Sequence, residues 1–310
     1  MIKKKIYDLI IVGAGPAGLS ATIYAKRALI KIAIFEKSLL GGKLNKTKEI
    51  DNYLGLHNIS GIKLVNKFIN HVKKYDIDWK YEEVIEIKKK KNFLINTIKN
   101  NKFKSKTVII STGTEDKKLG IKGEKKFNNL GVSYCVICDG FLFKNKKIAI
   151  IGGGYTSLES ALYMKNISKE IFIIYRGEKF KIEKEIIKRI KKSSKIKILF
   201  NYILEEIKGT KKLSSIIIKN LNNNEKKELE IDAVFPCIGS YPLNKSIHNM
   251  NICDKSNYII TKNDCSTTVP GLFSAGDVSR NYEKKIKQII TAVSDGAIAA
   301  QSVISYLKNN

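Results

Sequence analysis

Two cysteines three positions apart, Cys135 and Cys138, are the residues whose spacing points most directly to chemistry. A C-x-x-C pair brings two sulfur atoms within reach of a disulfide, and near βαβ units of a cytosolic protein it indicates a redox-active dithiol. Asp139 follows the second cysteine and could move a proton as thiolates are released. Its alternative role is to cap a helix. We therefore predict a redox centre formed by these three residues.

A metal site is the other common use of such a pair, but it needs a second pair of ligands. The three histidines are scattered along the chain, and the remaining cysteines form no second C-x-x-C. We predict no metal site, and we interpret the isolated cysteines as packed residues: Cys237, Cys253 and Cys265.

A glycine-rich turn with the spacing G-x-G-x-x-G begins at Gly13, after an apolar segment over residues 6–12 that we predict to be a buried strand. A helix is predicted over 19–28, and a second strand over 31–35 ends in Glu36, 23 residues after Gly13. A carboxylate at this place can bind ribose hydroxyls, and the amides at the start of the helix can bind phosphates. The predicted dinucleotide-binding residues are Gly13, Gly15, Pro16, Ala17, Gly18 and Glu36.

The same pattern returns later in the chain, with predicted strands at 147–151 and 170–174 and a helix at 158–165. The position that matches Glu36 is now Tyr175, followed by Arg176, with Lys179 and Lys181 nearby. Loss of the acid and gain of cations favours NADP over NAD, because a carboxylate would repel the 2′-phosphate. A decayed site in an unrelated α/β domain is the alternative. The predicted binding residues are Gly152, Gly154, Tyr155, Thr156, Ser157, Arg176 and Lys181.

Two unlike dinucleotide sites in one chain indicate an electron relay. The unit with Glu36 would hold FAD, and the unit with Arg176 would hold the nicotinamide cofactor that donates hydride. The protein would orient the two cofactors, and the cofactors would carry the redox chemistry.

Composition limits the remaining classes. The 310 residues carry a net charge of +28, but only four of the 57 cations are Arg, the residue on which base-reading surfaces usually depend. We therefore predict no nucleic-acid partner and keep a basic binding protein as the non-enzyme alternative. No apolar run approaches the ~20 residues of a membrane span, and the charged start at 1–5 leads into a segment interrupted by Asp8. Five cysteines make no disulfide scaffold, so a cytoplasmic location without a membrane is expected.

Over essentially its whole length the sequence resembles the low-molecular-weight, bacterial-type thioredoxin reductases, a class of FAD- and NAD(P)-dependent pyridine nucleotide-disulfide oxidoreductases. The pieces of the resemblance appear in family order at 13–18, 36, 41–44, 51–55, 111–113, 135–140, 152–157, 271–278 and 288 onward, where a helix is expected through 299.

The resemblance implies an α/β fold with two Rossmann-like domains. Residues 1–115 and 245–310 would form a split FAD domain, and residues 116–244 would form an inserted NAD(P) domain that carries the dithiol. It implies NADPH as donor, thioredoxin as acceptor and a homodimer, with Cys138 facing the flavin and Cys135 attacking the thioredoxin disulfide. Further flavin-binding residues implied by the resemblance are Gly42, Asn52, Thr112, Gly113, Asp277, Gln288 and Ile289.

The sequence departs from the family at the second nucleotide site. The family pattern His-Arg-Arg, three residues, Arg is here Tyr175, Arg176, Gly177 and finally Lys181. NADPH remains the predicted donor, with NADH or reduced ferredoxin as alternatives, and a peroxiredoxin or glutaredoxin-like carrier as an alternative acceptor. Both the dithiol and the nicotinamide site lie in the inserted domain, so rotation about connectors at 114–118 and 240–244 is expected. Other departures are Lys43, Ser157 and Lys287.

Overall fold

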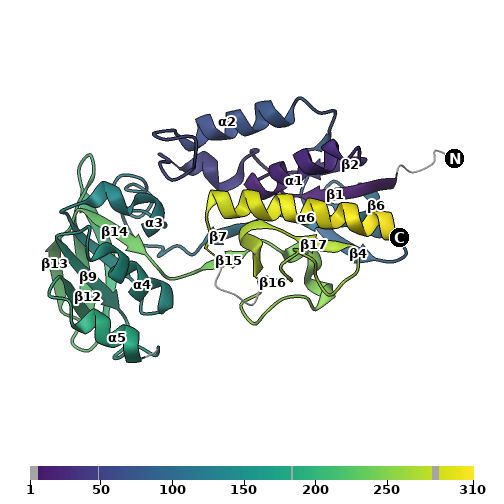
Figure 1. The fold of residues 1–310 in the computed structure, drawn as a ribbon. Coiled ribbons are helices and arrows are strands. Elements are labelled where there is room, and N and C mark those ends of the chain that lie inside the picture. The colour runs from purple at the N-terminus through teal and green to yellow at the C-terminus, as the bar shows by residue number, and fades with distance from the viewer. Residues whose placement is uncertain (1–5, 48, 183, 281–285) are drawn as a thin grey trace. The chain divides into compact units, whose positions relative to one another are not determined.

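The computed structural model describes residues 6–47, 49–182, 184–280 and 286–310. The chain forms two compact units, one built from Met1–Glu115 with Tyr241–Asn310 and the other from Asp116–Ser240 (Figure 1). The second unit is thus inserted into the first, and the chain returns at Tyr241, ahead of the expected 245. The charged start at 1–5 lies outside the described residues.

The first unit contains a sheet in the order β3-β2-β1-β6-β5-β4, with β17 also paired to β6. The parallel part of the sheet contains β1, β2, β3, β6 and β17. The remaining strands, β4 and β5, pair antiparallel to their neighbours. The strands are β1 (Ile6–Val12), β2 (Ile32–Phe35), β3 (Asp78–Lys80), β4 (Val84–Lys89), β5 (Phe93–Thr97), β6 (Lys102–Ile110) and β17 (Leu272–Ser274). The chain order reverses beside β1, because β2 and β6 flank it, and ligands of open α/β sheets bind at such a point.

Helices α1 (Pro16–Arg27) and α6 (Ile289–Asn309) pack against each other beside this sheet (Figure 1). Gly296 makes the close approach possible, because a Cβ there would lie 2.1 Å from the carbonyl oxygen of Ala17. Ser20 Oγ also donates to the carbonyl of Val293 at 2.7 Å. The first turn of α1 holds Pro16, which suits the first helical position, so the helix begins three residues before the predicted 19.

Helix α6 bears on the expectation that no apolar run approaches the length of a membrane span. By length and composition alone it could cross a membrane. Its small residues Ala292, Gly296, Ala299 and Ala300 are buried, and α1 lies against it. The helix also continues ten residues past the predicted end at 299, to Asn309.

The second unit contains a parallel sheet in the order β10-β9-β8-β14 and an antiparallel sheet in the order β11-β12-β13. The strands are β8 (Lys147–Ile151), β9 (Glu170–Tyr175), β10 (Ile196–Phe200), β11 (Tyr202–Gly209), β12 (Leu213–Asn220), β13 (Lys226–Glu230) and β14 (Ala233–Pro236). Its helices are α3 (Val136–Asp139), α4 (Tyr155–Met164) and α5 (Lys184–Lys191). Two apolar clusters fill the unit, one under the helices and one between the sheets.

The chain passes between the units twice, and the strands at these crossings, β7 (Thr114–Asp116) and β15 (Ser240–Pro242), pair with each other. The first unit is completed by elements that follow its main strands: α2 (Gly61–Val72), η1 (Gly42–Lys46), η3 (Lys245–Met250), η4 (Gly276–Val278), β16 (Ile259–Ile260) and β18 (Ser279–Arg280). In the second unit η2 (Gly140–Phe143) follows α3 directly.

Candidate active site

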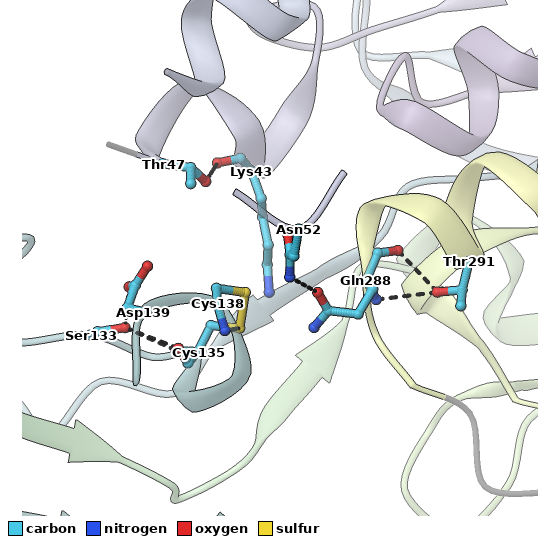
Figure 2. Close-up of a disulfide and its surroundings, with 9 residues drawn as sticks. All are labelled: Lys43, Thr47, Asn52, Ser133, Cys135, Cys138, Asp139, Gln288 and Thr291. Carbon is cyan, nitrogen blue, oxygen red and sulfur yellow. Dashed lines mark hydrogen bonds between the residues drawn. A yellow bond between two sulfur atoms is a disulfide. The ribbon is translucent and has the colours of Figure 1, made fainter. Parts of the chain in front are cut away.

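Cys135 and Cys138 form a disulfide in the structure, with their Cα atoms 5.2 Å apart (Figure 2). The one-turn helix α3 creates this geometry, because Cys135 caps the N-terminus of the helix and Cys138 lies in its last half. The backbone N–H of Cys138 donates to Cys135 Sγ at 3.1 Å. The first turn of α3 thus directs a backbone donor at Cys135 Sγ.

Asp139 is held by a serine that the cysteine spacing did not indicate. Ser133 Oγ donates a short hydrogen bond to Asp139 Oδ2, and it accepts one of 3.1 Å from the backbone N–H of Cys135. Asp139 precedes η2 but makes no side-chain cap to it, so the helix-capping alternative is not supported. The only signal for Ser133 in the sequence is a hydroxyl two positions before the first cysteine.

Apolar side chains next to the disulfide are exposed. Ile137, Phe141 and Leu142 have exposed fractions of 49%, 43% and 47%. Phe141 and Leu142 belong to η2, which begins directly after Asp139. Apolar residues grouped on a surface mark a contact for another apolar surface.

A buried carboxylate fixes the segment that leads into the dithiol. Glu124 accepts from the hydroxyl of Tyr134 at 2.6 Å and from the N–H groups of Leu119 and Gly120 at 2.8 Å each. Burial alone would raise the pKa of Glu124, but these hydrogen bonds and the charge of Lys118 hold it below its usual range. Burial and the bond to Glu124 raise the pKa of Tyr134. Glu124 was not indicated by any motif.

The first glycine turn has the shape of a phosphate cradle. Gly13 has a positive φ of 104°, and a Cβ at Gly18 would lie 1.9 Å from the Gly13 carbonyl oxygen. At Gly15, by contrast, no described atom lies within 4 Å of a Cβ position. The turn is therefore closed toward the protein and open where a pyrophosphate would approach the start of α1.

Glu36 lies at the end of β2, at the edge of the first turn. Its Oε2 accepts from the backbone N–H of Ala14 at 2.9 Å, and its Oε1 accepts from the N–H of Ser38 at 3.0 Å. Both bonds orient the carboxylate, and each oxygen retains a lone pair for a ribose hydroxyl.

The turn after β6 carries an unsatisfied polar atom. Thr112 Oγ1 is buried and has no hydrogen-bond partner among the described residues. A Cβ at Gly42, at the start of η1, would lie 3.7 Å from Gly15, and Lys43 Nζ donates to Thr114 Oγ1 at 3.1 Å. A bound cofactor that reaches from the glycine turn toward Thr112 would supply the missing partner, so these residues fit FAD.

Segments from the far end of the chain complete this region of the first unit. Strand β17 is parallel to β6, and its last residue, Ser274, pairs with Ile110. The turn at Gly276 and Asp277 follows this strand end. The Gly276 N–H donates to Asp295 Oδ2 at 2.9 Å. Asn52 Nδ2 donates to Gln288 Oε1 at 3.0 Å (Figure 2), and Gln288 caps α6, which begins at Ile289.

The second glycine turn is built in the same way with different residues. A Cβ at Gly152 would lie 2.6 Å from the carbonyl oxygen of Cys237, and Gly154 is open on the side of α4. Ser157 is buried, and its Oγ donates to the Gly152 carbonyl at 2.7 Å. The serine in place of a third glycine thus closes the turn. The helix begins at Tyr155, which brings Thr156 into its first turn.

The ring of Tyr175 covers the second turn. A Cβ at Gly153 would lie 2.4 Å from this ring, and one at Gly177 would lie 2.8 Å from it. Phe180 also stacks on the Tyr175 ring, with ring centroids 5.7 Å apart. Arg176, Lys179 and Lys181 are exposed, and none forms an ion pair within the described part of the chain. These cations are available to an anionic ligand.

The isolated cysteines are packed residues. Burial raises the pKa of the Cys237 thiol to about 11, and Cys265 is buried in the core of the first unit. Cys253 Sγ accepts from Asn244 Nδ2 at 3.2 Å. Across the residues with described positions, no three His, Cys, Asp or Glu side chains are grouped in a way that could hold a metal.

Comparison with known proteins agrees with these features over the full chain. The family described as pyridine nucleotide-disulphide oxidoreductase matches residues 7–296. Thioredoxin reductase of Bacillus subtilis (strain 168) is 36% identical over 309 residues, which cover 99% of this chain and 97% of that protein. Thioredoxin reductase of Ureaplasma parvum serovar 3 is 38% identical over 310 residues, with 100% and 99% covered.

A solved structure extends the match to three dimensions. The crystal structure of thioredoxin reductase from Streptococcus pyogenes MGAS5005 has a TM-score of 0.93 and 33% identity, and the match covers 98% of this chain and 99% of that one. The expected α/β fold with two Rossmann-like domains is confirmed. The two glycine turns, the dithiol between them and these full-length matches show that the chain belongs to the pyridine nucleotide-disulphide oxidoreductase family.

Proposed function

We propose that the chain is a flavoprotein thioredoxin-disulfide reductase, which passes electrons from NADPH through FAD and the Cys135–Cys138 disulfide to thioredoxin. The observation that carries the proposal is the Cys135–Cys138 disulfide. It lies on α3, and this helix ends only 13 residues before the second glycine turn at Gly152. The name shared by the full-length relatives supports the same activity.

In the first unit, FAD accepts a hydride and passes on two electrons when bound. Amides of the first glycine turn bind its pyrophosphate, and Glu36 binds its adenosine ribose. The rest of the cofactor would be held at the carboxyl ends of β6 and β17, where the Thr112 hydroxyl lacks a partner among the described residues. The residues assigned to this part are Gly42, Asn52, Thr112, Gly113, Asp277, Gln288 and Ile289.

In the second unit, the amides at Gly154, Tyr155 and Thr156 bind the pyrophosphate of NADPH. Arg176 and Lys181 bind the 2′-phosphate, and the absence of a carboxylate at Tyr175 removes the repulsion that would exclude it. NADH or reduced ferredoxin is the alternative donor, because Gly177 supplies no side chain to the phosphate.

The dithiol transfers the electrons by exchange. Two electrons open the Cys135–Cys138 bond and leave two sulfurs, one of which receives a proton from Asp139. The Cys135 thiolate then attacks the thioredoxin disulfide, and a bond from Cys135 to one thioredoxin sulfur forms as the thioredoxin S–S bond breaks. Cys138 returns its proton to Asp139 and attacks Cys135 Sγ of this mixed disulfide, which restores the internal disulfide and releases thioredoxin, whose two thiolates take up protons from water.

The exposed apolar residues Ile137, Phe141 and Leu142 favour a protein acceptor, since a small disulfide needs no such surface. Thioredoxin is the first candidate, and a peroxiredoxin or glutaredoxin-like carrier is the second. The lysine-rich surface would steer an acidic carrier, with a rate that falls as salt is added. A homodimer in the cytoplasm, with no membrane or nucleic-acid partner, completes the proposal, and light scattering of the purified protein would test the dimer.

Turnover requires one flavin to exchange electrons with the nicotinamide site and with the dithiol, and both belong to the inserted unit. We infer that the units rotate about the two crossings that contain β7 and β15. An engineered crosslink between the units should stop turnover and spare one half-reaction. Full activity of the crosslinked protein would contradict the rotation.

Rapid-mixing spectroscopy tests the donor. We expect NADPH to bleach the bound flavin faster than NADH or reduced ferredoxin does, and no bleaching by NADPH would overturn that assignment. Cys138→Ser should retain FAD and lose thioredoxin reduction. A protein purified without flavin absorbance, and with salt-sensitive nucleic-acid binding, would instead support the non-enzyme alternative.

A further inference from the structure

We propose that Ser133 is a positioning residue that controls the direction of the hydrogen bond at the Asp139 carboxyl group, and thereby assists proton transfer to the dithiol. The proposal rests on the proposed function, in which Asp139 supplies a proton. Ser133 belongs to the segment before α3 and is 5% exposed, so its hydroxyl is shielded from bulk water.

The Ser133 hydroxyl has more partners than it has hydrogens. It accepts from the Cys135 N–H at 3.1 Å, and it has two acceptors within reach, Asp139 Oδ2 and the Cys135 carbonyl oxygen at 3.4 Å. A serine hydroxyl carries one hydrogen, so it can serve only one acceptor at a time. Which acceptor it serves must follow the protonation state of Asp139.

Each state of Asp139 can be matched by one orientation of the Ser133 hydroxyl. An ionised Asp139 accepts the Ser133 hydrogen, as in the structure. A protonated Asp139 donates to Ser133 Oγ, whose own hydrogen then turns to the Cys135 carbonyl. The switch requires rotation of one O–H bond and no movement of heavy atoms.

Proton transfer uses this switch. The O–H group of the Asp139 carboxyl first turns away from Ser133 Oγ toward the dithiol. Its O–H bond then breaks, an S–H bond forms on a thiolate of the newly reduced dithiol, and no further electrons are exchanged. The Ser133 hydrogen turns to Asp139 Oδ2 in the same step and stabilises the negative charge that appears there. Ser133 therefore favours the carboxylate that the transfer produces.

Ser133→Ala tests this role. Loss of a hydrogen bond to the ionised form raises the pKa of a carboxyl group, so the pH profile of thioredoxin reduction should shift upward by about one unit, with a rate about tenfold lower. Ser133→Thr should restore most of both. Ser168→Ala is the matched control, because Ser168 is a buried serine of the same unit whose Oγ has no described partner.

Combination with Asp139→Asn separates this role from simple support of the Cys135 backbone. If Ser133 acts through Asp139, Ser133→Ala should have no further effect in the Asp139→Asn protein. An equal loss in both backgrounds would overturn the proposal. So would an unchanged pH profile in the single variant.

A measurement without turnover keeps this test distinct from the proposed function. After chemical reduction, the ultraviolet absorbance of the thiolates is titrated with pH. Asp139 should stay neutral to a higher pH in Ser133→Ala, so the thiols should ionise at lower pH, and this shift should vanish with Asp139→Asn. The other titratable side chains of the neighbouring elements are unchanged in all variants: Tyr134 before α3, and Tyr155, Glu159 and Tyr163 of α4. If the variants shift the thiol titration as described but the wild-type protein reduces no thioredoxin, the proposed function alone is refuted.

Discussion

Glu36 Oε2 accepts a hydrogen bond of 2.9 Å from the backbone N–H of Ala14. At the corresponding positions of the second unit, the ring of Tyr175 lies over Gly153. One unit thus places a negative charge at the ribose position of its glycine turn, and the other places an aromatic ring with cations around it. This difference underlies the first three predictions.

We expect Glu36→Gln to weaken FAD binding by about ten- to a hundredfold, because the hydrogen bonds that a charged carboxylate makes are replaced by weaker neutral ones. The measurement is the dissociation constant of FAD from the apoprotein, followed by flavin fluorescence. Glu83→Gln is the control, since Glu83 forms an exposed ion pair with Lys37 in the same unit. Equal effects of the two substitutions would refute the role of Glu36.

Arg176→Ala should raise the dissociation constant of NADPH by about tenfold or more and leave that of NADH almost unchanged, because only NADPH carries the 2′-phosphate. Binding is measured by titration of the oxidised protein with each nucleotide. Arg189→Ala, on the exposed side of α5, provides the control for removal of an arginine charge from the same unit. A similar loss for both nucleotides would argue against phosphate recognition.

Gly153→Ala should destabilise the second unit by about 1–3 kcal/mol, because its methyl group would overlap the Tyr175 ring and force it to move. Thermal unfolding measures the loss. Gly154→Ala is the matched control, since a Cβ there meets no described atom within 4 Å. In a Tyr175→Ala protein, which loses its own ring packing, Gly153→Ala should add little further loss, and additive losses would exclude the contact between ring and turn.

Glu124 should make the stability of the protein depend on pH. Its pKa in the folded protein lies below the ordinary value of 4.5, so its contribution is complete above that value and disappears as the pH falls through the folded pKa. We expect Glu124→Gln to lower the free energy of unfolding at neutral pH by about 1–3 kcal/mol, with a smaller difference from wild type in acid.

Urea unfolding at several pH values measures this effect. Tyr134→Phe should remove one of the three hydrogen bonds of Glu124 and reproduce part of the loss. A difference between Glu124→Gln and wild type that stays constant into acid would contradict the assignment.

The parts of the site that are contiguous in sequence could be predicted from the sequence. The glycine turns, Glu36 and the Cys135–Cys138 pair depend on a few neighbouring residues. The structure places each glycine turn between a strand and a helix, as expected, and Glu36 directly after β2. The strand 147–151 was predicted with its observed bounds. Helix ends were less exact, because glycine and proline can occupy a first helical turn when the strand before it fixes the chain.

The parts that depend on distant contacts could not be predicted. Ser133 and Glu124 act through side-chain bonds whose partners no periodicity reveals. The packing of Tyr175 on Gly153 joins the end of β9 to the turn after β8. The pairing of β17 with β6 connects residues more than 160 positions apart, and only the family resemblance indicated that the C-terminal segment returns to the first unit.

The insertion of one unit into the other also sets an order for folding during synthesis. Residues 116–240 are contiguous and can fold as soon as they leave the ribosome. The first unit must wait, since α1 packs against α6 and β6 pairs with β17, both from the last part of the chain. A nascent protein would therefore carry a folded dithiol unit before it has a finished flavin pocket, and it could acquire FAD only after β17 and α6 have been synthesised.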